Sequence, residues 1–241
     1  VEKFTKSIQF DYKIALYDVW GSWAHVSILE KRGFLTNDEC HKLKKGLGEI
    51  YLSILKGAFQ KDDTCEDIHT DIQKKLEGKV GDLVLKLHTA RSRNDQVVFA
   101  TKMYCKDKIR EIQKNIDALK VAINYLSEKN NDIIIPGFTH LQHAQPVYLK
   151  DYLAAYSSML TRDHERLGYI SKNMKIRMGA GALAGTPIPH DLYNVEIDKL
   201  VKESPVLKSL KVESTTNSLD AVSDRDFVIE IISALSIVAM H

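Results

Sequence analysis

Glycine and proline are scarce in this sequence, which holds 12 glycines and 5 prolines among 241 residues. Together they make up about 7% of the chain, against an average of about 12% in proteins. Aromatic residues are also few, at 8%. A sandwich or barrel of short strands needs frequent turns, and turns draw on glycine and proline. The shortage therefore argues against those all-β architectures.

No charge of one sign dominates: 34 basic and 32 acidic residues leave a formal net charge of +2. This balance gives no electrostatic reason to expect nucleic acid or an acidic membrane surface as a partner. The longest apolar stretch, residues 231–240, is interrupted by two serines and is too short to cross a bilayer. The N-terminus also lacks the basic and apolar segments of a signal peptide. We therefore expect neither a nucleic-acid nor a membrane partner.

Cysteine is rare, and its pattern argues against two kinds of cysteine-based scaffold. Cys40, Cys65 and Cys105 are odd in number, widely spaced and without a CxxC pair. This disfavours both a disulfide framework and a zinc site. It indicates a reducing compartment, and we expect a cytoplasmic protein. The first residue is Val1 rather than methionine, so we expect the sequence to begin inside a longer gene product.

Apolar residues recur at helical spacing in the first ninety residues. Residues 16–29 carry one such stripe. Thr36 followed by Glu39 predicts a capping box at the start of the next helix. A shorter helix is expected over residues 68–76, with Gly78 as its end.

Longer helices are expected in the rest of the chain. Residues 109–126 have apolar side chains at alternating steps of three and four, as in a coiled coil. With a lead-in from about Val97, this helix would be roughly 30 residues or ~45 Å long. Residues 149–174 form a second such seam, and residues 228–238 begin a third. Helices of this length are stable only when packed against similar partners, which predicts a bundle shared between subunits.

The shorter helices give way to the long ones near residues 85–95. We therefore predict an N-terminal helical domain over residues 1–90. A long-helix bundle domain is expected over residues 91–241, incomplete at its C-terminus. No segment alternates as a strand, although residues 133–135 are compatible with a short extended piece.

A dense polar segment, residues 87–96 (LHTARSRNDQ), directly precedes the first long helix. The guanidinium groups of Arg91 and Arg93, with hydroxyl and amide groups at a helix N-terminus, are suited to an anion. The alternative is a helix cap with a solvated charge cluster. Composition alone favours that alternative.

A second polar segment, residues 136–146 (PGFTHLQHAQP), is bracketed by prolines and predicts an ordered loop. His140 has the right chemistry for an acid or base near neutral pH. Metal ligation by His140 and His143 ranks low, because no third ligand stands at a suitable spacing. A structural hydrogen bond is the other alternative for either histidine.

Two further segments have structural interpretations. Residues 179–187 (GAGALAGTP) have the spacing GxGxxxG and follow no strand, so they do not fit a dinucleotide loop. A tight turn that allows close backbone approach is expected instead. Residues 217–226 are expected to form a helix cap on Ser218, followed by ion pairs.

Five segments in one order resemble the argininosuccinate lyase family, within the fumarase and aspartase superfamily. Their separations are also similar to those of the family, so the resemblance covers nearly the whole chain. Ala90 departs from it, since the family more often has glycine there. The five segments are residues 66–70 (EDIHT), 89–97 (TARSRNDQV), 137–146 (GFTHLQHAQP), 179–186 (GAGALAGT) and 217–227 (NSLDAVSDRDF).

The resemblance implies an all-α subunit whose long helices associate into a homotetramer. It implies a cofactor-free, reversible elimination that splits argininosuccinate into arginine and fumarate. A sister lyase acting on adenylosuccinate or fumarate is the first alternative, disfavoured because SRND and THLQHAQP match the argininosuccinate branch better. The second is a non-catalytic structural protein, since delta-crystallins belong to the same group.

The resemblance also implies roles for particular residues. His140 corresponds to the acid–base histidine of the family. No metal is implied, and the sites are expected to be shared between subunits. The family's loop with the catalytic serine would lie beyond His241, so residues 1–241 alone are expected to be inactive. Substrate binding is implied for Ser7, Asn94 and Thr139, with Ser92, Arg93 and Asp67 nearby.

Overall fold

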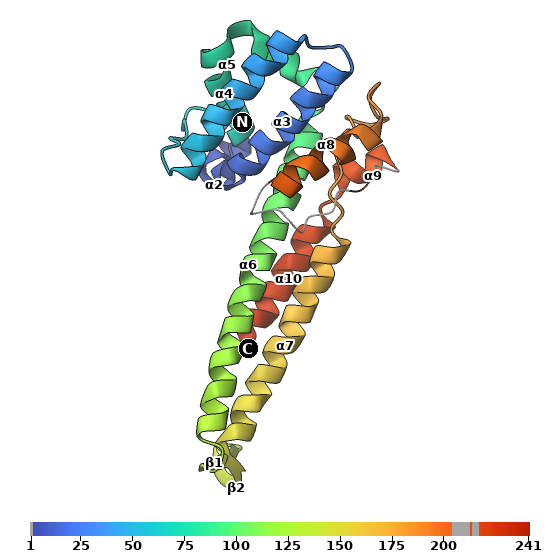
Figure 1. Cartoon of the computed structure of the whole chain (residues 1–241). Helices are drawn as coiled ribbons and strands as arrows, with labels where there is room; N and C mark the ends of the chain where they lie inside the picture. Colours follow the sequence, from blue (N-terminus) through green and yellow to red (C-terminus); the bar gives the residue numbers. More distant parts are fainter. Residues whose placement is uncertain (1, 204–212, 214–216) are drawn as a thin grey trace. The chain divides into compact units, whose positions relative to one another are not determined.

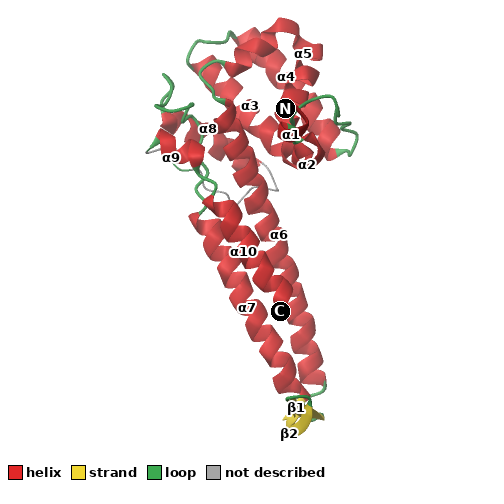
Figure 2. Cartoon of the chain, turned by 180° about the vertical axis from the view of Figure 1, so that it is seen from behind, coloured by secondary structure: helices red, strands yellow, loops and turns green. Residues whose placement is uncertain are grey.

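The computed structural model describes residues 2–203, 213 and 217–241 of the chain (Figure 1). Helices dominate this part, and its strands form a two-stranded sheet (Figure 2). The predicted all-α fold class is confirmed. In chain order the elements are α1 (Glu2–Thr5), α2 (Ile8–Asp11), the 3-10 helix η1 (Tyr12–Ile14), α3 (Ala15–Lys31), α4 (Asn37–Leu55), α5 (Ile68–Val80), the 3-10 helix η2 (Gly81–His88), α6 (Arg93–Lys129), β1 (Ile134–Thr139), β2 (Gln142–Tyr148), α7 (Leu149–Asn173), α8 (His190–Glu203), α9 (Ser218–Ser223) and α10 (Asp226–Met240).

The chain divides by its internal packing into two compact units. Unit 1 consists of residues 1–107 and 175–224, and unit 2 of residues 108–174 and 225–241. The domain boundary expected between residues 90 and 91 falls inside unit 1 and stays a prediction. Among the described helices, none combines the length and the apolar character that a bilayer crossing requires.

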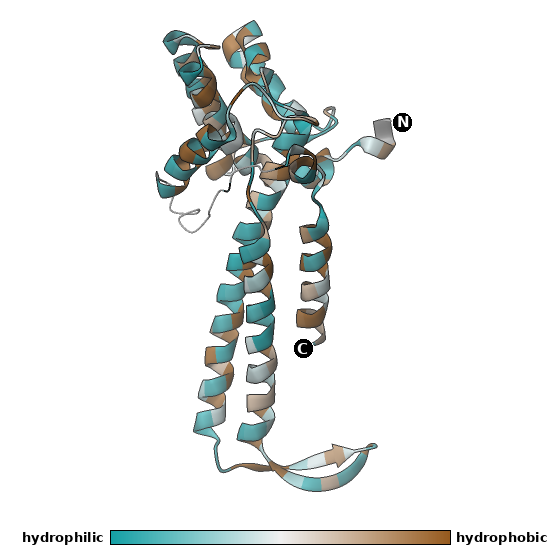
Figure 3. Ribbon diagram, turned by 90° about the vertical axis from the view of Figure 1, so that its right-hand side faces the viewer, coloured by the Kyte–Doolittle hydropathy of each residue, from teal (hydrophilic) through white to brown (hydrophobic). Residues whose placement is uncertain are grey.

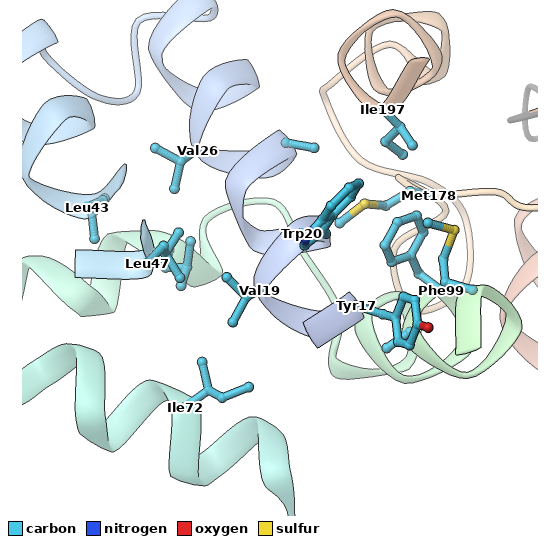
Figure 4. Close-up of a cluster of buried hydrophobic side chains, with 14 of the residues drawn as sticks. Tyr17, Val19, Trp20, Val26, Leu43, Leu47, Ile72, Phe99, Met178 and Ile197 are labelled. Atoms are coloured by element: carbon cyan, nitrogen blue, oxygen red, sulfur yellow. The ribbon is translucent and has the colours of Figure 1, made fainter. Parts of the chain in front are cut away.

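Helix α3 lies at the centre of the core of unit 1. The helix predicted over residues 16–29 is confirmed, but its buried residues occupy nearly every side rather than one stripe. A helix that is apolar all round is packed on all its faces. Side chains from four other helices surround it, among them Leu43, Leu47, Ile72, Phe99 and Ile197 (Figure 4).

Unit 2 contains long helices that run side by side (Figure 1), together with strands β1 and β2. The three seams predicted from the sequence are confirmed as helices α6, α7 and α10, and Figure 3 shows hydrophobic residues on successive turns of α10. Ile109 and Ile116 of α6 are buried, whereas Leu119 and Leu126 are 50% and 47% exposed. The apolar seam of α6 therefore continues beyond the part that unit 2 itself covers.

The segment predicted as a loop over residues 136–146 is instead a β-hairpin, so that prediction is wrong. Strands β1 and β2 pair antiparallel, with Pro136 opposite Pro146 and Thr139 opposite Gln142. Both strands are edges of the sheet. Proline has no N–H to donate to a neighbouring strand, and an edge strand can tolerate this loss. The extended piece expected at residues 133–135 is confirmed from Ile134 onward.

The turn of this hairpin has an unusual backbone. Its two central residues, His140 and Leu141, have φ of +50° and +62°. Positive φ at both central positions is the signature of a type I′ turn, which normally uses Asn-Gly or Gly-Gly. Each left-handed residue other than glycine costs roughly 1–2 kcal/mol. The turn therefore stores backbone strain at the residue predicted to act in acid–base chemistry.

The predicted helix ends are partly confirmed. Thr36 and Glu39 form the expected capping box. Helix α5 does not end at Gly78, because it continues to Val80, and Gly81 with φ of +61° terminates it. A glycine can lie inside a helix, whereas a left-handed residue after its last turn ends it.

The cap expected on Ser218 is also corrected. The Asn217 side chain accepts the Asp220 backbone N–H at 3.1 Å and is the N-cap of α9. The ion pairs expected after it are present: Arg177 Nη1 lies 2.8 Å from Asp220 Oδ2, and Lys102 pairs with Asp224.

The three cysteines are all free. Cys40 is buried and donates a hydrogen bond to Glu30 at 3.0 Å. Burial, helped by that carboxylate, raises the pKa of the Cys40 thiol to about 11. Burial likewise raises the pKa of Cys105 to about 11. Thiols with such pKa values remain protonated at neutral pH.

The two glycines of α5 should respond to alanine with opposite signs. Gly78→Ala should raise the free energy of unfolding by about 0.5–1 kcal/mol, because alanine favours helix and nothing lies within 4 Å of the new Cβ. Gly81→Ala should lower it by about 1 kcal/mol, because φ is +61° there. Urea denaturation of both variants measures the difference. Stabilisation by Gly81→Ala would contradict the assignment of the helix end.

Candidate active site

The polar segment of residues 87–96 forms the start of helix α6. Ser92 Oγ accepts the backbone N–H of Asn94 at 3.2 Å, as a capping side chain does. Asn94 is exposed at this helix end, where free N–H groups and the helix dipole favour negative charge. The predicted cap is therefore confirmed, but the charge cluster is not solvated throughout, because Nε and Nη2 of Arg91 are buried. The anion-binding role stays a prediction.

Ala90 precedes this helix and has φ of +53°. This left-handed conformation favours glycine. Alanine in this conformation therefore carries a local cost of about 1–2 kcal/mol.

Asp95 connects the start of α6 to the glycine-rich segment of residues 179–187. Its buried carboxylate accepts the backbone N–H of Ala180 at 3.0 Å and that of Gly181 at 2.8 Å. Burial raises the pKa of Asp95, although the hydrogen bonds from Gly181, Ser92 and Ala180 oppose the rise. Two of the segments that the sequence singled out are thereby held together inside unit 1.

The glycine-rich segment is the tight turn that the sequence predicts. Gly179 and Gly181 have φ of +89° and +67°. A Cβ at Gly179 would lie 2.5 Å from the Tyr193 ring, and one at Gly181 would lie 2.7 Å from the Gly185 carbonyl oxygen. Larger side chains at these positions would push the turn away from Asp95.

A second buried group of charges lies beside this contact. Arg91 Nη1 donates to Ser22 Oγ at 3.0 Å, while Nε and Nη2 are buried and unpaired within the described ranges. Asp18 accepts Gln96 Nε2 at 2.6 Å, and its Oδ1 lies 3.0 Å from His69 Nδ1. Burial would raise the pKa of Asp18, but His69, Arg91 and Gln96 together lower it.

His25 completes the buried network in its neutral form. Its Nε2 donates to the Thr89 carbonyl oxygen at 2.9 Å, which leaves Nδ1 to accept the Tyr193 hydroxyl at 3.0 Å. Burial and the positive charge of Arg91 hold the pKa of His25 well below its usual value. His25 therefore adds no positive charge beside Arg91 near neutral pH.

Ser7, Asp67 and Arg93 lie in one set of contacts in unit 1. The Ser7 backbone N–H donates to the Glu66 carbonyl at 2.8 Å, and its hydroxyl donates to Asp11 at 2.6 Å. Asp67 caps α5 by accepting the Thr70 N–H at 2.7 Å. Arg93 Nη1 lies 3.7 Å from Asp67 Oδ1. Asp67 thus has a structural role, whether or not it also binds substrate.

Thr139 and His140 lie in the hairpin of unit 2, where both are exposed. Thr139 is the last residue of β1, and His140 begins the turn. His143 is also in the hairpin, and its ring lies 4.7 Å from that of Phe138. No group of three His, Cys, Asp or Glu residues suited to a metal occurs in the described part of the chain.

The predicted site residues are therefore divided between the two units. Unit 1 holds five of them, and unit 2 holds Thr139 and His140. Sequence reasoning missed the roles of Asp95, His25 and Tyr193. Asp95 lies within a segment that the sequence singled out, but its partners are backbone N–H groups distant in sequence, and these have no side-chain signature.

A cavity of about 840 Å³ in unit 1 contains none of the predicted site residues. Its wall is largely apolar and aromatic, with basic side chains among its lining. The lining includes Trp20, Trp23, Lys44, Lys45, Tyr51 and Leu200.

Comparison with known proteins gives a family match over the full chain. A family model described as lyase matches residues 1–241. The argininosuccinate lyase of Streptococcus thermophilus is 43% identical over 242 residues, and that of Syntrophotalea carbinolica is 40% identical over 243 residues. Each alignment covers 100% of this chain and 50% of the relative. The chain thus spans about half the length of the curated relatives it matches.

Solved structures of lyases have a similar fold. An EDDS lyase variant with bound fumarate has a TM-score of 0.75 at 23% identity, covering 93% of this chain and 42% of that one. A fumarate lyase:delta crystallin from Brucella melitensis, bound to cobalt, has a TM-score of 0.80 at 17% identity, covering 100% and 56%. At these identities the likeness supports the fold alone.

Replacing Asp95 by asparagine should destabilise unit 1. The amide has one acceptor oxygen, so its NH₂ group would face one of the two backbone N–H donors now bound by the carboxylate. A buried donor without a partner costs about 1–3 kcal/mol, measurable by urea denaturation. The control is Asp63→Asn at an exposed position, expected within about 0.5 kcal/mol of the parent. Equal effects of the two changes would contradict the importance of the Asp95 contact.

His88 should make stability depend on pH in mildly acidic solution. Burial and the positive charges of Arg91 and Arg93 lower the pKa of His88 from 6.5 to about 4. The unfolded chain therefore binds this proton first, and stability falls as the pH drops from about 6.5 to about 4. An NMR titration of the imidazole should give this lowered pKa, and His88→Gln should reduce the pH dependence in that window, to which His25 also contributes. An ordinary midpoint near 6.5 would contradict the burial of a neutral ring.

Proposed function

This chain belongs to the lyase family whose model matches residues 1–241, and on that premise we propose that the whole protein is an argininosuccinate lyase. It would split argininosuccinate reversibly into arginine and fumarate without a cofactor, as part of arginine biosynthesis. The observation that carries the proposal is the identity of 40–43% to curated argininosuccinate lyases across the entire chain.

The reaction begins with removal of a proton from the carbon beside a substrate carboxylate. The resulting aci-carboxylate carries two negative charges, and departure of the guanidino nitrogen requires a proton. Such a site needs hydrogen-bond donors and positive charge that are fixed before the reaction starts. The exposed start of α6, with Asn94, Arg93 and Ser92, offers these groups on a helix end anchored by buried Asp95.

The remaining roles follow from the family pattern. Ser7, Asn94 and Thr139 bind the substrate, with Ser92, Arg93 and Asp67 nearby. His140 moves a proton, and its exposed position at the tip of the hairpin leaves the imidazole accessible. Within the described part of the chain, no hydrogen bond occupies its ring, which supports a role outside the packed core.

We propose a cytoplasmic homotetramer in which the active sites are assembled from more than one subunit. One feature supports it: the apolar seam of α6 remains half exposed at Leu119 and Leu126. Contact with the same helices of other subunits would bury such a seam.

Incubation of the whole protein with argininosuccinate tests the activity directly. Fumarate release, followed by its ultraviolet absorbance, together with formation of arginine would support the proposal. Turnover of adenylosuccinate instead would favour the sister lyase. A folded tetramer that releases no fumarate from either substrate would favour a crystallin-like structural role.

His140→Asn in the whole protein should lower kcat by about 10²–10⁴-fold, the usual loss on removing an acid or base. Asparagine is tolerated at positive φ, so the turn and the melting temperature should be retained. His143→Asn is the matched control, because it removes the other imidazole of the same hairpin. If His140→Asn keeps kcat within a few-fold of the parent, His140 is not the acid–base group. Loss of activity together with unfolding would favour a structural role for His140.

A further inference from the structure

Leu141 lies in the turn of the hairpin, in a conformation that leucine rarely adopts. Its φ is +62°, next to His140 with φ of +50°. Its side chain is also 94% exposed. Glycine or asparagine would satisfy this turn without strain and without an apolar group in water. No contact within unit 2 offsets either the backbone strain of Leu141 or the exposure of its apolar side chain.

The exposed apolar surface is not limited to this one side chain. Phe138 and Ile134 of β1 and Tyr148 of β2 are also exposed. The hairpin directly joins α6 to α7, and the exposed seam residues Leu126 and Tyr152 belong to those helices. The hairpin is therefore continuous in the chain with the helical surface for which we propose contact between subunits.

Strained residues persist where surrounding contacts hold them, and they gather at functional sites. We propose that Leu141 is a positioning residue that packs against a second copy of the subunit and so fixes His140 for catalysis. This rests on the proposed function and on its shared active sites. Leu141 directly follows His140 in the two-residue turn. Immobilising Leu141 would therefore also fix the backbone that carries the imidazole.

Substitution at position 141 distinguishes this role from simple exposure. Leu141→Asn keeps a residue that tolerates positive φ but removes the apolar group. We expect kcat to fall about 10- to 100-fold with a smaller change in KM, because a misplaced catalytic group reduces turnover on this scale. Leu141→Met, which retains apolar bulk, should stay within a few-fold of the parent. Leu85→Asn is the matched control, since Leu85 is an exposed leucine of unit 1, and it should leave kcat unchanged.

Two other results at position 141 would overturn the proposal. If Leu141 contacts nothing, Leu141→Asn relieves strain and should keep kcat within about twofold while the protein becomes more stable. That result would overturn the proposal. So would equal losses in the asparagine and methionine variants, because packing would then not be the cause.

Photo-crosslinking tests the contact without any assay of catalysis. The crosslinker p-benzoyl-phenylalanine at position 141 of the whole protein should give a covalent dimer after irradiation. Crosslinks confined to one chain would place Leu141 against its own subunit, and absence of crosslinks would leave it in solvent. Either outcome overturns the proposal. A crosslinked dimer together with no fumarate release by the unsubstituted protein would retain the contact and reject the proposed function, so the two failures are distinguishable.

Discussion

The buried carboxylate of Asp95 is the constraint on which the arrangement of unit 1 depends. It binds two consecutive backbone N–H groups of the glycine-rich turn, at 3.0 and 2.8 Å, from the first turn of the longest helix. A carboxylate removed from water needs such donors, and the turn needs an acceptor for its N–H groups. Each partner therefore satisfies the other. The start of α6 is fixed by this exchange rather than by surface charges, which salt and solvent would weaken.

The surrounding charges follow from the same burial. Neutral His25 lies between the Thr89 carbonyl and the Tyr193 hydroxyl, and Tyr193 limits the space beside Gly179. Because burial and Arg91 lower the pKa of His25 and of His88, neither imidazole adds a positive charge beside the arginines of the segment near neutral pH.

Periodicity predicted the helices well, because the apolar spacing of α6, α7 and α10 follows from burial of one face and needs no other information. The hairpin was harder to predict. None of its strand residues is fully buried, so no strict alternation of apolar and polar residues marks the strands. Its turn uses His140 and Leu141 where glycine would have been the signal. Gly78 and Gly81 show a further limit, since only the backbone conformation distinguishes a glycine inside a helix from one that ends it. The candidate site residues came from family resemblance, and the partners of Asp95 are backbone groups that no sequence pattern reveals.

The free cysteines have a practical consequence for labelling. Alkylating reagents such as maleimides react with the thiolate, and the thiols of Cys40 and Cys105, with pKa values of about 11, supply very little of it at neutral pH. Cys65 is buried, and its pKa is raised as well. A cysteine introduced at an exposed position would react far faster than any of the three. Fluorophores or spin labels can therefore be attached at chosen sites while the native cysteines stay in the protein.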